Sequence, residues 1–202
     1  MRFRPRPGGS HAAALLAALA VVLGAPAWDA GTRRARADAD DWQLSARTGI
    51  ASVVVDHRDP LGERAAVDGQ YGLDDAWAIR ATGSLARMTV SANQQSGLPG
   101  GTIWAYSGLV GLVYTMDVLR LLPTFEVSAA MLGETGAVVR PHRALGLQAA
   151  IGADYLLRPR LSVGGIAEYI FAPFDLVSNA LNGNAVPQAF AFSARVSWTF
   201  FH

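Results

Sequence analysis

Apolar and polar residues alternate along several short segments of the chain, and the pattern is clearest in the segment that ends it. Every second position from 190 to 200 is apolar, and most of these residues are large: Phe190, Phe192, Ala194, Val196, Trp198 and Phe200. The positions between them hold small, polar or charged residues: Ala191, Ser193, Arg195, Ser197 and Thr199. A period of two places these sets on opposite faces of a β-strand. One face is therefore large and apolar, and the other carries the charge.

The same alternation predicts eight strands, near residues 42–54, 64–73, 76–90, 103–116, 121–132, 144–157, 160–172 and 188–201. Short connections at 74–75, 117–120 and 158–159 alternate with longer stretches at 55–63, 91–102, 133–143 and 173–187. A soluble barrel or sandwich would turn its large apolar residues inward to fill its core. The residues predicted to face inward here are small, which disfavours that alternative. Large outward residues, with short turns on one side and long loops on the other, predict an all-β, eight-stranded antiparallel up-and-down transmembrane β-barrel.

Aromatic residues gather near the strand ends in the outward parity, as expected for the belts that mark the two edges of a membrane. The periplasmic edge is predicted to carry Trp42, Tyr71, Trp77, Tyr114, Tyr155, Trp198 and Phe200. The outer edge is predicted to carry Trp104, Tyr106, Tyr169, Phe171 and Phe190.

The N-terminus has the features of a secretory signal peptide, predicted over residues 1–37, which leaves a barrel domain over residues 38–202. Three arginines precede an apolar stretch at 12–24 that is too short to span a bilayer, which disfavours the alternative of a membrane-anchoring helix. Ala35-Arg36-Ala37 fits a cleavage site, and Ala25-Pro26-Ala27 is a competing one. Cleavage after Ala37 leaves 17 − 6 = 11 basic and 16 − 1 = 15 acidic residues, a net charge of −4. That balance gives no support to nucleic-acid binding.

Three features resemble small eight-stranded bacterial outer-membrane β-barrel proteins of the OmpA, OmpX and OmpW type. They are Tyr71-Gly72-Leu73-Asp74-Asp75 followed by Trp77, the aromatic final strand from Phe190 to Phe201, and the rhythm of strands and loops. The resemblance implies location in the outer membrane of a Gram-negative bacterium, after export through the inner membrane. It also implies contact with outer-membrane lipid and lipopolysaccharide, and recognition of the final strand by the barrel-assembly machinery. One departure is His202, which stands where the family usually has a final aromatic residue.

The inward parity collects the charged residues of the strands. The predicted barrel-interior charges are Arg47, Asp68, Arg80, Glu126, Asp154, Glu168 and Arg195, accompanied by Gln43, Gln70 and Gln148. Charges confined in so narrow a barrel must pair or stay hydrated. Counting from the periplasmic strand ends, Glu168 and Arg195 are predicted to form an ion pair. The interior is interpreted as a charge-paired structural core, with a narrow gated polar path as the alternative.

The sequence offers little for catalysis or ligand chemistry. There is no cysteine, and Gly97-Leu98-Pro99-Gly100-Gly101 lacks the lysine and the helix of a phosphate loop. His57 and His142 fall in predicted outer loops, and His142 has no serine nearby in sequence, so no catalytic residue, metal site or cofactor is predicted. Loop carboxylates at Asp56, Asp59, Glu63 and Asp175 match no ion-binding motif.

Two functions remain open. The first is a non-enzymatic, structural or envelope-interacting barrel with a charge-paired interior. The second is an outer-membrane transport channel for a small and perhaps hydrophobic solute, because several inward residues are apolar. These residues are Leu109, Val113, Leu122, Leu132, Leu156, Ile166 and Ile170. The solute, the loop-binding partner and the oligomeric state are not predicted.

Overall fold

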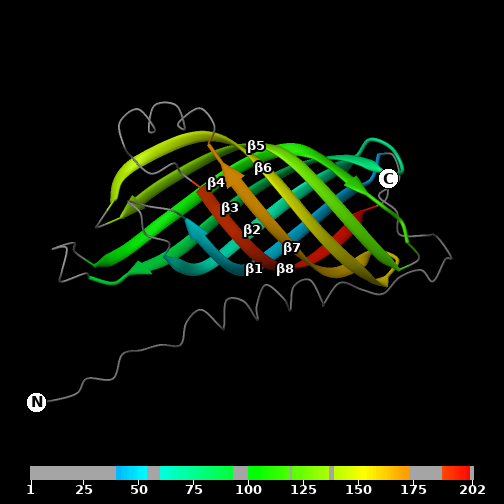
Figure 1. The fold of residues 1–202 in the computed structure, drawn as a ribbon. Coiled ribbons are helices and arrows are strands. Elements are labelled where there is room, and N and C mark those ends of the chain that lie inside the picture. The colour runs from blue at the N-terminus through cyan, green and yellow to red at the C-terminus, as the bar shows by residue number, and fades with distance from the viewer. Residues whose placement is uncertain are drawn as a thin grey trace, which may run out of the picture. The chain divides into compact units, whose positions relative to one another are not determined.

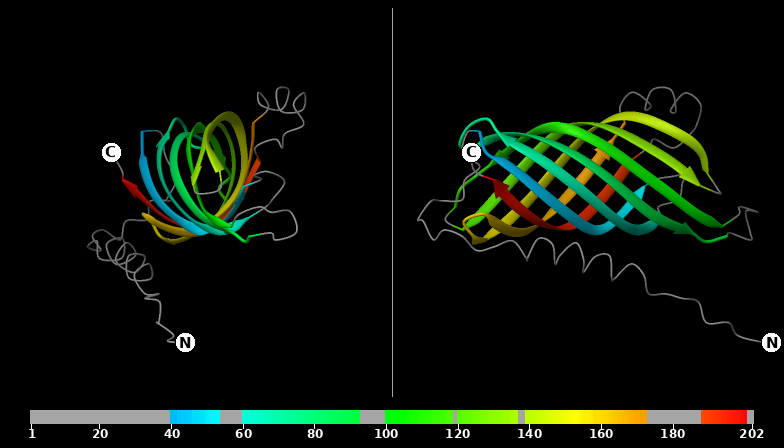
Figure 2. Two further views of the ribbon diagram at one scale, coloured as in Figure 1. Left: turned by 90° about the vertical axis from the view of Figure 1, so that its left-hand side faces the viewer. Right: turned by 180° about the vertical axis from the view of Figure 1, so that it is seen from behind.

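The computed structural model describes residues 40–53, 60–92, 100–118, 120–136, 139–172 and 188–200. They form eight strands: β1 (Trp42–Val53), β2 (Leu61–Gly72), β3 (Trp77–Val90), β4 (Gly101–Thr115), β5 (Leu121–Gly136), β6 (Val139–Arg158), β7 (Leu161–Phe171) and β8 (Gln188–Phe200). Each strand pairs antiparallel with the next, and β8 pairs with β1 to close the barrel (Figure 1). Seen from one end, the strands form a tilted ring (Figure 2, left). The predicted eight-stranded antiparallel barrel is confirmed.

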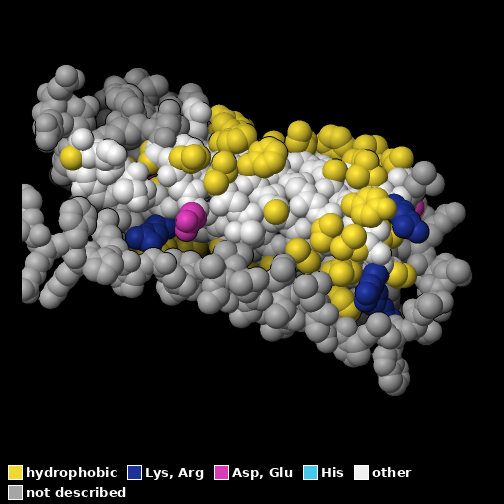
Figure 3. All heavy atoms as spheres, turned by 90° about the horizontal axis from the view of Figure 1, so that it is seen from below, with side chains coloured by type: hydrophobic (Ala, Val, Ile, Leu, Met, Phe, Trp, Pro, Cys, Tyr) yellow, Lys and Arg dark blue, Asp and Glu magenta, His cyan; other side chains and the backbone are white. Residues whose placement is uncertain are grey.

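Side chains alternate between the two surfaces of the wall as the period of two predicts. Along β3, buried and exposed residues alternate at nearly every position. Buried positions hold mostly small and polar residues, with some large apolar ones such as Met88 and Ile103, whereas Val127, Leu145 and Ile151 are exposed by about two thirds. On the face shown in Figure 3, hydrophobic side chains spread over the wall and charged ones lie toward the barrel ends. An exterior of this kind is suited to lipid rather than to water.

Short turns join the strands at the end of the barrel where β1 begins and β8 ends. The turn between β2 and β3 is held by Asp74, whose Oδ1 accepts hydrogen bonds from the backbone N–H groups of Ala76 (2.7 Å) and Trp77 (2.8 Å). Those bonds favour the charged form and so hold the pKa of the Asp74 carboxyl below its ordinary value. The predicted short turns at 74–75, 117–120 and 158–159 all fall between the ends of successive strands.

The predicted loop at 133–143 is wrong in large part. Strand β5 continues to Gly136 and β6 begins at Val139, with an irregularity in the pairing between Glu134 and Gly136. Glycine and charged residues are typical of loops, and they predict one there. Strand pairing is made by backbone hydrogen bonds, however, so two strands that are already aligned can continue through such residues. Glu134 also keeps the inward parity of Leu132 and is buried. A smaller difference is β2, which begins at Leu61 rather than at residue 64.

The predicted signal peptide, its two candidate cleavage sites, His57, Asp56, Asp59, Asp175 and His202 lie outside the described residues. Within the described part of the chain, no helix is long and apolar enough to cross a membrane.

Candidate functional site

The barrel interior holds a set of buried charges. All seven predicted interior charges, Arg47, Asp68, Arg80, Glu126, Asp154, Glu168 and Arg195, are at least 95 % buried. An eighth, Arg64, is 5 % exposed and was not among the predicted charges, although it lies within the predicted strand 64–73. Its parity matches that of Asp68 four residues later, which would have identified it. These four arginines and four carboxylates are called the charge network below.

Glu168 on β7 is the most connected carboxylate of the charge network. Its Oε1 accepts hydrogen bonds from Arg47 Nη1 (2.6 Å) and Gln148 Nε2 (2.9 Å). Its Oε2 pairs with Nη1 of Arg64. Arg47 comes from β1, Arg64 from β2 and Gln148 from β6. One carboxylate therefore ties four strands together across the interior.

Arg47 and Arg80 extend the charge network toward β2 and β5. Arg47 Nε donates to Asp68 Oδ2 (2.5 Å), and the hydroxyl of Thr82 donates to Asp68 Oδ1 (2.7 Å). Arg80 Nη1 donates to Glu126 Oε2 (2.7 Å), while its Nε and Nη2 both donate to Gln70 Oε1. Each of these carboxylates thus accepts a charge-assisted hydrogen bond, which offsets part of the cost of burying it.

The predicted Glu168–Arg195 ion pair is wrong. Arg195 instead forms a two-point pair with Asp154, with Nε donating to Oδ1 (3.0 Å) and Nη2 to Oδ2 (2.7 Å). The error lies in the register, because Arg195 stands opposite Gly164 on β7, whereas Glu168 stands opposite Ala191 on β8. The two residues are therefore four positions apart along the strands. Counting from the strand ends had ignored the stagger between neighbouring strands that closing a barrel requires.

Glycine makes room for the arginines at two places in the charge network. Gly164 lies between Arg195 and Asp154 in the register, and a Cβ there would stand 2.0 Å from Asp154 Oδ1. Gly111 lies between Arg80 and Ser128, and a Cβ there would stand 2.1 Å from Ser128 Oγ. An arginine can therefore reach a partner two strands away because the strand between them presents no side chain.

Four buried atoms of the interior have no hydrogen-bond partner among the described protein atoms: Arg64 Nη2, Gln148 Oε1, Ser193 Oγ and Arg195 Nη1. Two of them belong to side chains that bind Glu168. Buried polar atoms normally have partners, so these positions retain the capacity to bind water or a small polar group.

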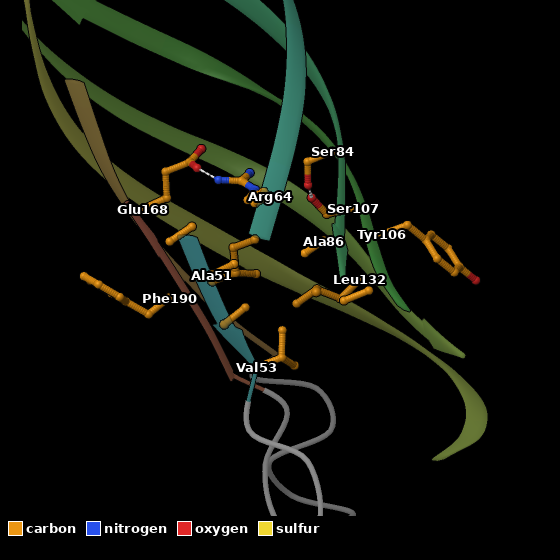
Figure 4. Close-up of a pocket in the computed structure, with 14 residues that line it drawn as sticks. Ala51, Val53, Arg64, Ser84, Ala86, Tyr106, Ser107, Leu132, Glu168 and Phe190 are labelled. Carbon is orange, nitrogen blue, oxygen red and sulfur yellow. Dashed lines mark hydrogen bonds and ion pairs between the residues drawn. The ribbon is translucent and has the colours of Figure 1, made fainter. Parts of the chain in front are cut away.

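The extracellular half of the interior is largely apolar, although Glu134 is also buried there. Ala51, Val53, Ala86, Ala105, Leu132 and Ile170 line a small cavity of about 30 Å³, called the apolar chamber below. Figure 4 shows the Arg64–Glu168 pair at one end of this chamber, with Tyr106 and Phe190 pointing away from it. Of the predicted inward apolar residues, Leu109, Val113, Leu132, Ile166 and Ile170 are buried. Leu122 and Leu156 are half-buried and border a second cavity that also contains Arg80 and Asp154.

The twelve aromatic residues predicted for the two belts divide by exposure. Trp42, Trp77, Trp104, Tyr155, Tyr169, Phe190 and Phe200 are exposed, and Tyr71, Tyr106, Tyr114, Phe171 and Trp198 are half-exposed. Neighbouring strands bring aromatic rings together at the end with the short turns. The ring centroids of Trp42 and Tyr71 are 5.1 Å apart, and those of Trp77 and Tyr114 are 5.0 Å apart.

The hydroxyl of Ser128 donates to Glu126 Oε1 (2.9 Å) inside the charge network. No group of three or more His, Cys, Asp or Glu side chains that could hold a metal ion occurs among the described residues.

No protein-family model and no curated protein sequence matches the chain. Solved structures match its fold. The Neisserial surface protein A is 14 % identical, with a TM-score of 0.59 over 79 % of this chain and 97 % of that one. OprG from Pseudomonas aeruginosa is 12 % identical, with a TM-score of 0.58 over 84 % and 100 %. Ail from Yersinia pestis, solved with the heparin analogue sucrose octasulfate, is 13 % identical, with a TM-score of 0.53 over 80 % and 99 %. The chain thus has the fold of small eight-stranded outer-membrane barrels, as the sequence resemblance indicated.

Proposed function

We propose that the protein is a non-enzymatic outer-membrane β-barrel with a structural or envelope-interacting role, whose interior is closed by the charge network. The observation that carries this proposal is the pairing across the interior. Glu168 on β7 binds arginines from β1 and β2, Arg80 on β3 binds Glu126 on β5, and Arg195 on β8 binds Asp154 on β6. Paired charges reaching across an eight-stranded barrel fill the space through which an ion would have to pass.

The balance of charge also favours a closed interior over a selective pore. The charge network contains four arginines and four carboxylates, and each of them takes part in an ion pair. A pore that selects ions by charge normally presents one dominant sign along its lining. Paired opposite charges instead link neighbouring and facing strands.

The location is supported by the exterior, where large apolar residues are exposed over the wall and aromatic residues stand near its edges. Gel mobility of the membrane fraction, boiled against unboiled, tests it together with N-terminal sequencing. We expect an outer-membrane band that shifts on boiling and begins at or near Asp38. A soluble, unshifted band would contradict the proposed location.

Conductance of the purified barrel in a planar lipid bilayer tests the closed interior. We expect the wild type to show no steady single-channel steps. The variant Glu168→Ala, which removes the carboxylate shared by Arg47 and Arg64, should show intermittent openings. Regular steps from the wild type would contradict a closed charge network.

A second candidate is passage of a small, largely apolar solute, and the apolar chamber favours it. The chamber occupies the extracellular half and ends at Arg64, whose Nη2 has no partner among the described protein atoms. An exit sideways through the wall finds no support, since the described strands pair continuously around the barrel. Uptake of indole into liposomes that contain the barrel would favour this candidate, whereas uptake equal to that of empty liposomes would exclude it for indole.

A further inference from the structure

Among the side chains of the wall that the structure describes, few exposed ones are charged, and most of these lie near the extracellular end. They are Glu63, Arg87, Arg143 and Arg158. Arg158 ends β6 at the side of the short turns, whereas the other three lie in the extracellular parts of β2, β3 and β6. A charged side chain on the lipid-facing side of a barrel destabilises it at the membrane midplane but has little effect at the interface. The position of these arginines along the membrane normal therefore decides whether they face acyl chains or headgroups.

That height can be obtained from the strands. On β3, Arg87 lies ten residues after Trp77, which stands at the opposite edge of the barrel. At ~3.4 Å per residue and a tilt of ~40°, this is a rise of ~26 Å, close to the ~25 Å height of the apolar band. Arg143 precedes Tyr155 by twelve residues on β6, which by the same geometry is a rise of ~31 Å. Both guanidinium groups thus stand at the level of the headgroups of the outer leaflet.

Arg87 has an aromatic neighbour on the wall, and Arg143 lies in the same register row as Tyr106. Arg87 Cζ lies 5.9 Å from the centroid of the Trp104 ring on β4. The ring of Tyr106 lies over Gly133 on β5, where an added Cβ would stand 2.2 Å from the ring. Gly133 is in turn the register partner of Arg143. The arginines on β3 and β6 therefore stand on either side of the aromatic side chains of β4, and the ring of Tyr106 extends over β5.

Neither guanidinium forms an ion pair with a carboxylate among the described residues. Glu63 stands opposite Arg87 in the register, yet the guanidinium of Arg87 lies beside Trp104 and makes no ion pair with Glu63. On β3 to β6, every described carboxylate within a strand is buried in the interior: Glu126, Glu134 and Asp154. The donors of Arg87 and Arg143 are therefore available to an anion that approaches from the membrane.

We propose that Arg87, Trp104, Tyr106 and Arg143 form a binding site for the phosphorylated headgroup of a lipid in the outer leaflet. Guanidinium groups bind phosphate through two parallel hydrogen bonds, and aromatic side chains seat at the boundary between headgroup and acyl chain. The two arginines are separated by three inter-strand spacings of ~4.8 Å, which long side chains can span around one headgroup. The site rests on the proposed location in the outer membrane, and it does not depend on whether the interior conducts.

Lipid binding to the purified, detergent-solubilised full barrel tests the site, with native mass spectrometry as the readout and lipid A as the probe. We expect Arg87→Gln and Arg143→Gln each to weaken lipid A binding about five-fold, and the double variant about 25-fold. Dephosphorylated lipid A should bind the wild type about as weakly as lipid A binds the double variant. Arg87→Lys keeps the charge but loses the two-point geometry, so its affinity should fall between those of the wild type and Arg87→Gln.

Arg120→Gln is the matched control, because Arg120 is exposed in the turn at the opposite end of the barrel and its loss changes the net charge equally. Equal affinity for lipid A in the wild type and the double variant would overturn the site. So would an equal loss in Arg120→Gln, which would indicate attraction by net charge alone. Displacement of lipid A by inorganic phosphate alone would replace the lipid site with a simple anion site. A barrel absent from the outer membrane would contradict the proposed location, whereas the lipid A affinities of the purified protein would still decide the site.

Discussion

The two halves of the barrel interior are built by the same strands with the same parity, but from different side chains. Toward the end with the short turns, arginines and carboxylates reach across the barrel and meet. Toward the extracellular end, Ala51, Ala86 and Ala105 face inward and leave the apolar chamber. The barrel diameter is set by the number of strands and their stagger, so the length of the inward side chains decides which half is filled. The ion pairs of the filled half link strands across the interior, whereas the short side chains around the chamber do not reach across the barrel.

Of the substitutions that test the difference between the two halves, Glu168→Ala is expected to change the free energy of unfolding most. The substitution leaves Arg47 and Arg64 without their shared carboxylate in a buried site, and we expect it to destabilise the barrel by about 3–5 kcal/mol. Urea unfolding of the barrel refolded in detergent micelles measures this. Glu63→Ala removes a carboxylate from the exposed outer wall and should change the free energy of unfolding by less than about 0.5 kcal/mol. Equal effects of the two substitutions would contradict a buried charge network.

A smaller loss is expected from Gly164→Ala. A Cβ at this position would stand 2.0 Å from Asp154 Oδ1, so the Arg195–Asp154 pair must shift, at a cost of about 1–3 kcal/mol. The adjacent Gly165→Ala is a close control, because an added Cβ there meets nothing nearer than 3.7 Å. The same unfolding measurement on both variants is informative. If Gly165→Ala were the more damaging of the two, the close approach at Gly164 would not be what makes glycine necessary.

The smallest effect is expected where the interior is not filled. Ala51→Leu places a larger apolar side chain beside the apolar chamber, and we expect a change below about 1 kcal/mol because its register partners, Gly62 and Ala191, are small and uncharged. Ala150→Leu is the counterpart beside the charge network, since Ala150 stands opposite both Glu126 and Glu168 in the register. Overpacking there should cost about 1–3 kcal/mol. Similar tolerance at the two positions would show that the two halves of the interior do not differ in packing.

Much of the charge network could be recognised in the sequence, since Arg47, Glu168 and Arg195 share the inward parity of their strands and prove to be buried. Arg64 was not among the predicted charges, although it lies within the predicted strand and has the inward parity of Asp68. The partners could not be predicted in the same way. The Glu168–Arg195 pair was chosen from positions along two neighbouring strands, but Arg195 in fact binds Asp154 on β6.

The sequence by itself determined which face of each strand turns inward, because a period of two is a local property that the chain carries at every residue. It thereby determined the strand number, the apolar exterior and the charged interior. Only the tertiary structure decided which charges meet, because the stagger between strands sets the height of each side chain and closure brings β1 against β8. The pairing of β3 to β6 in turn places Arg87 and Arg143 on neighbouring parts of the outer wall.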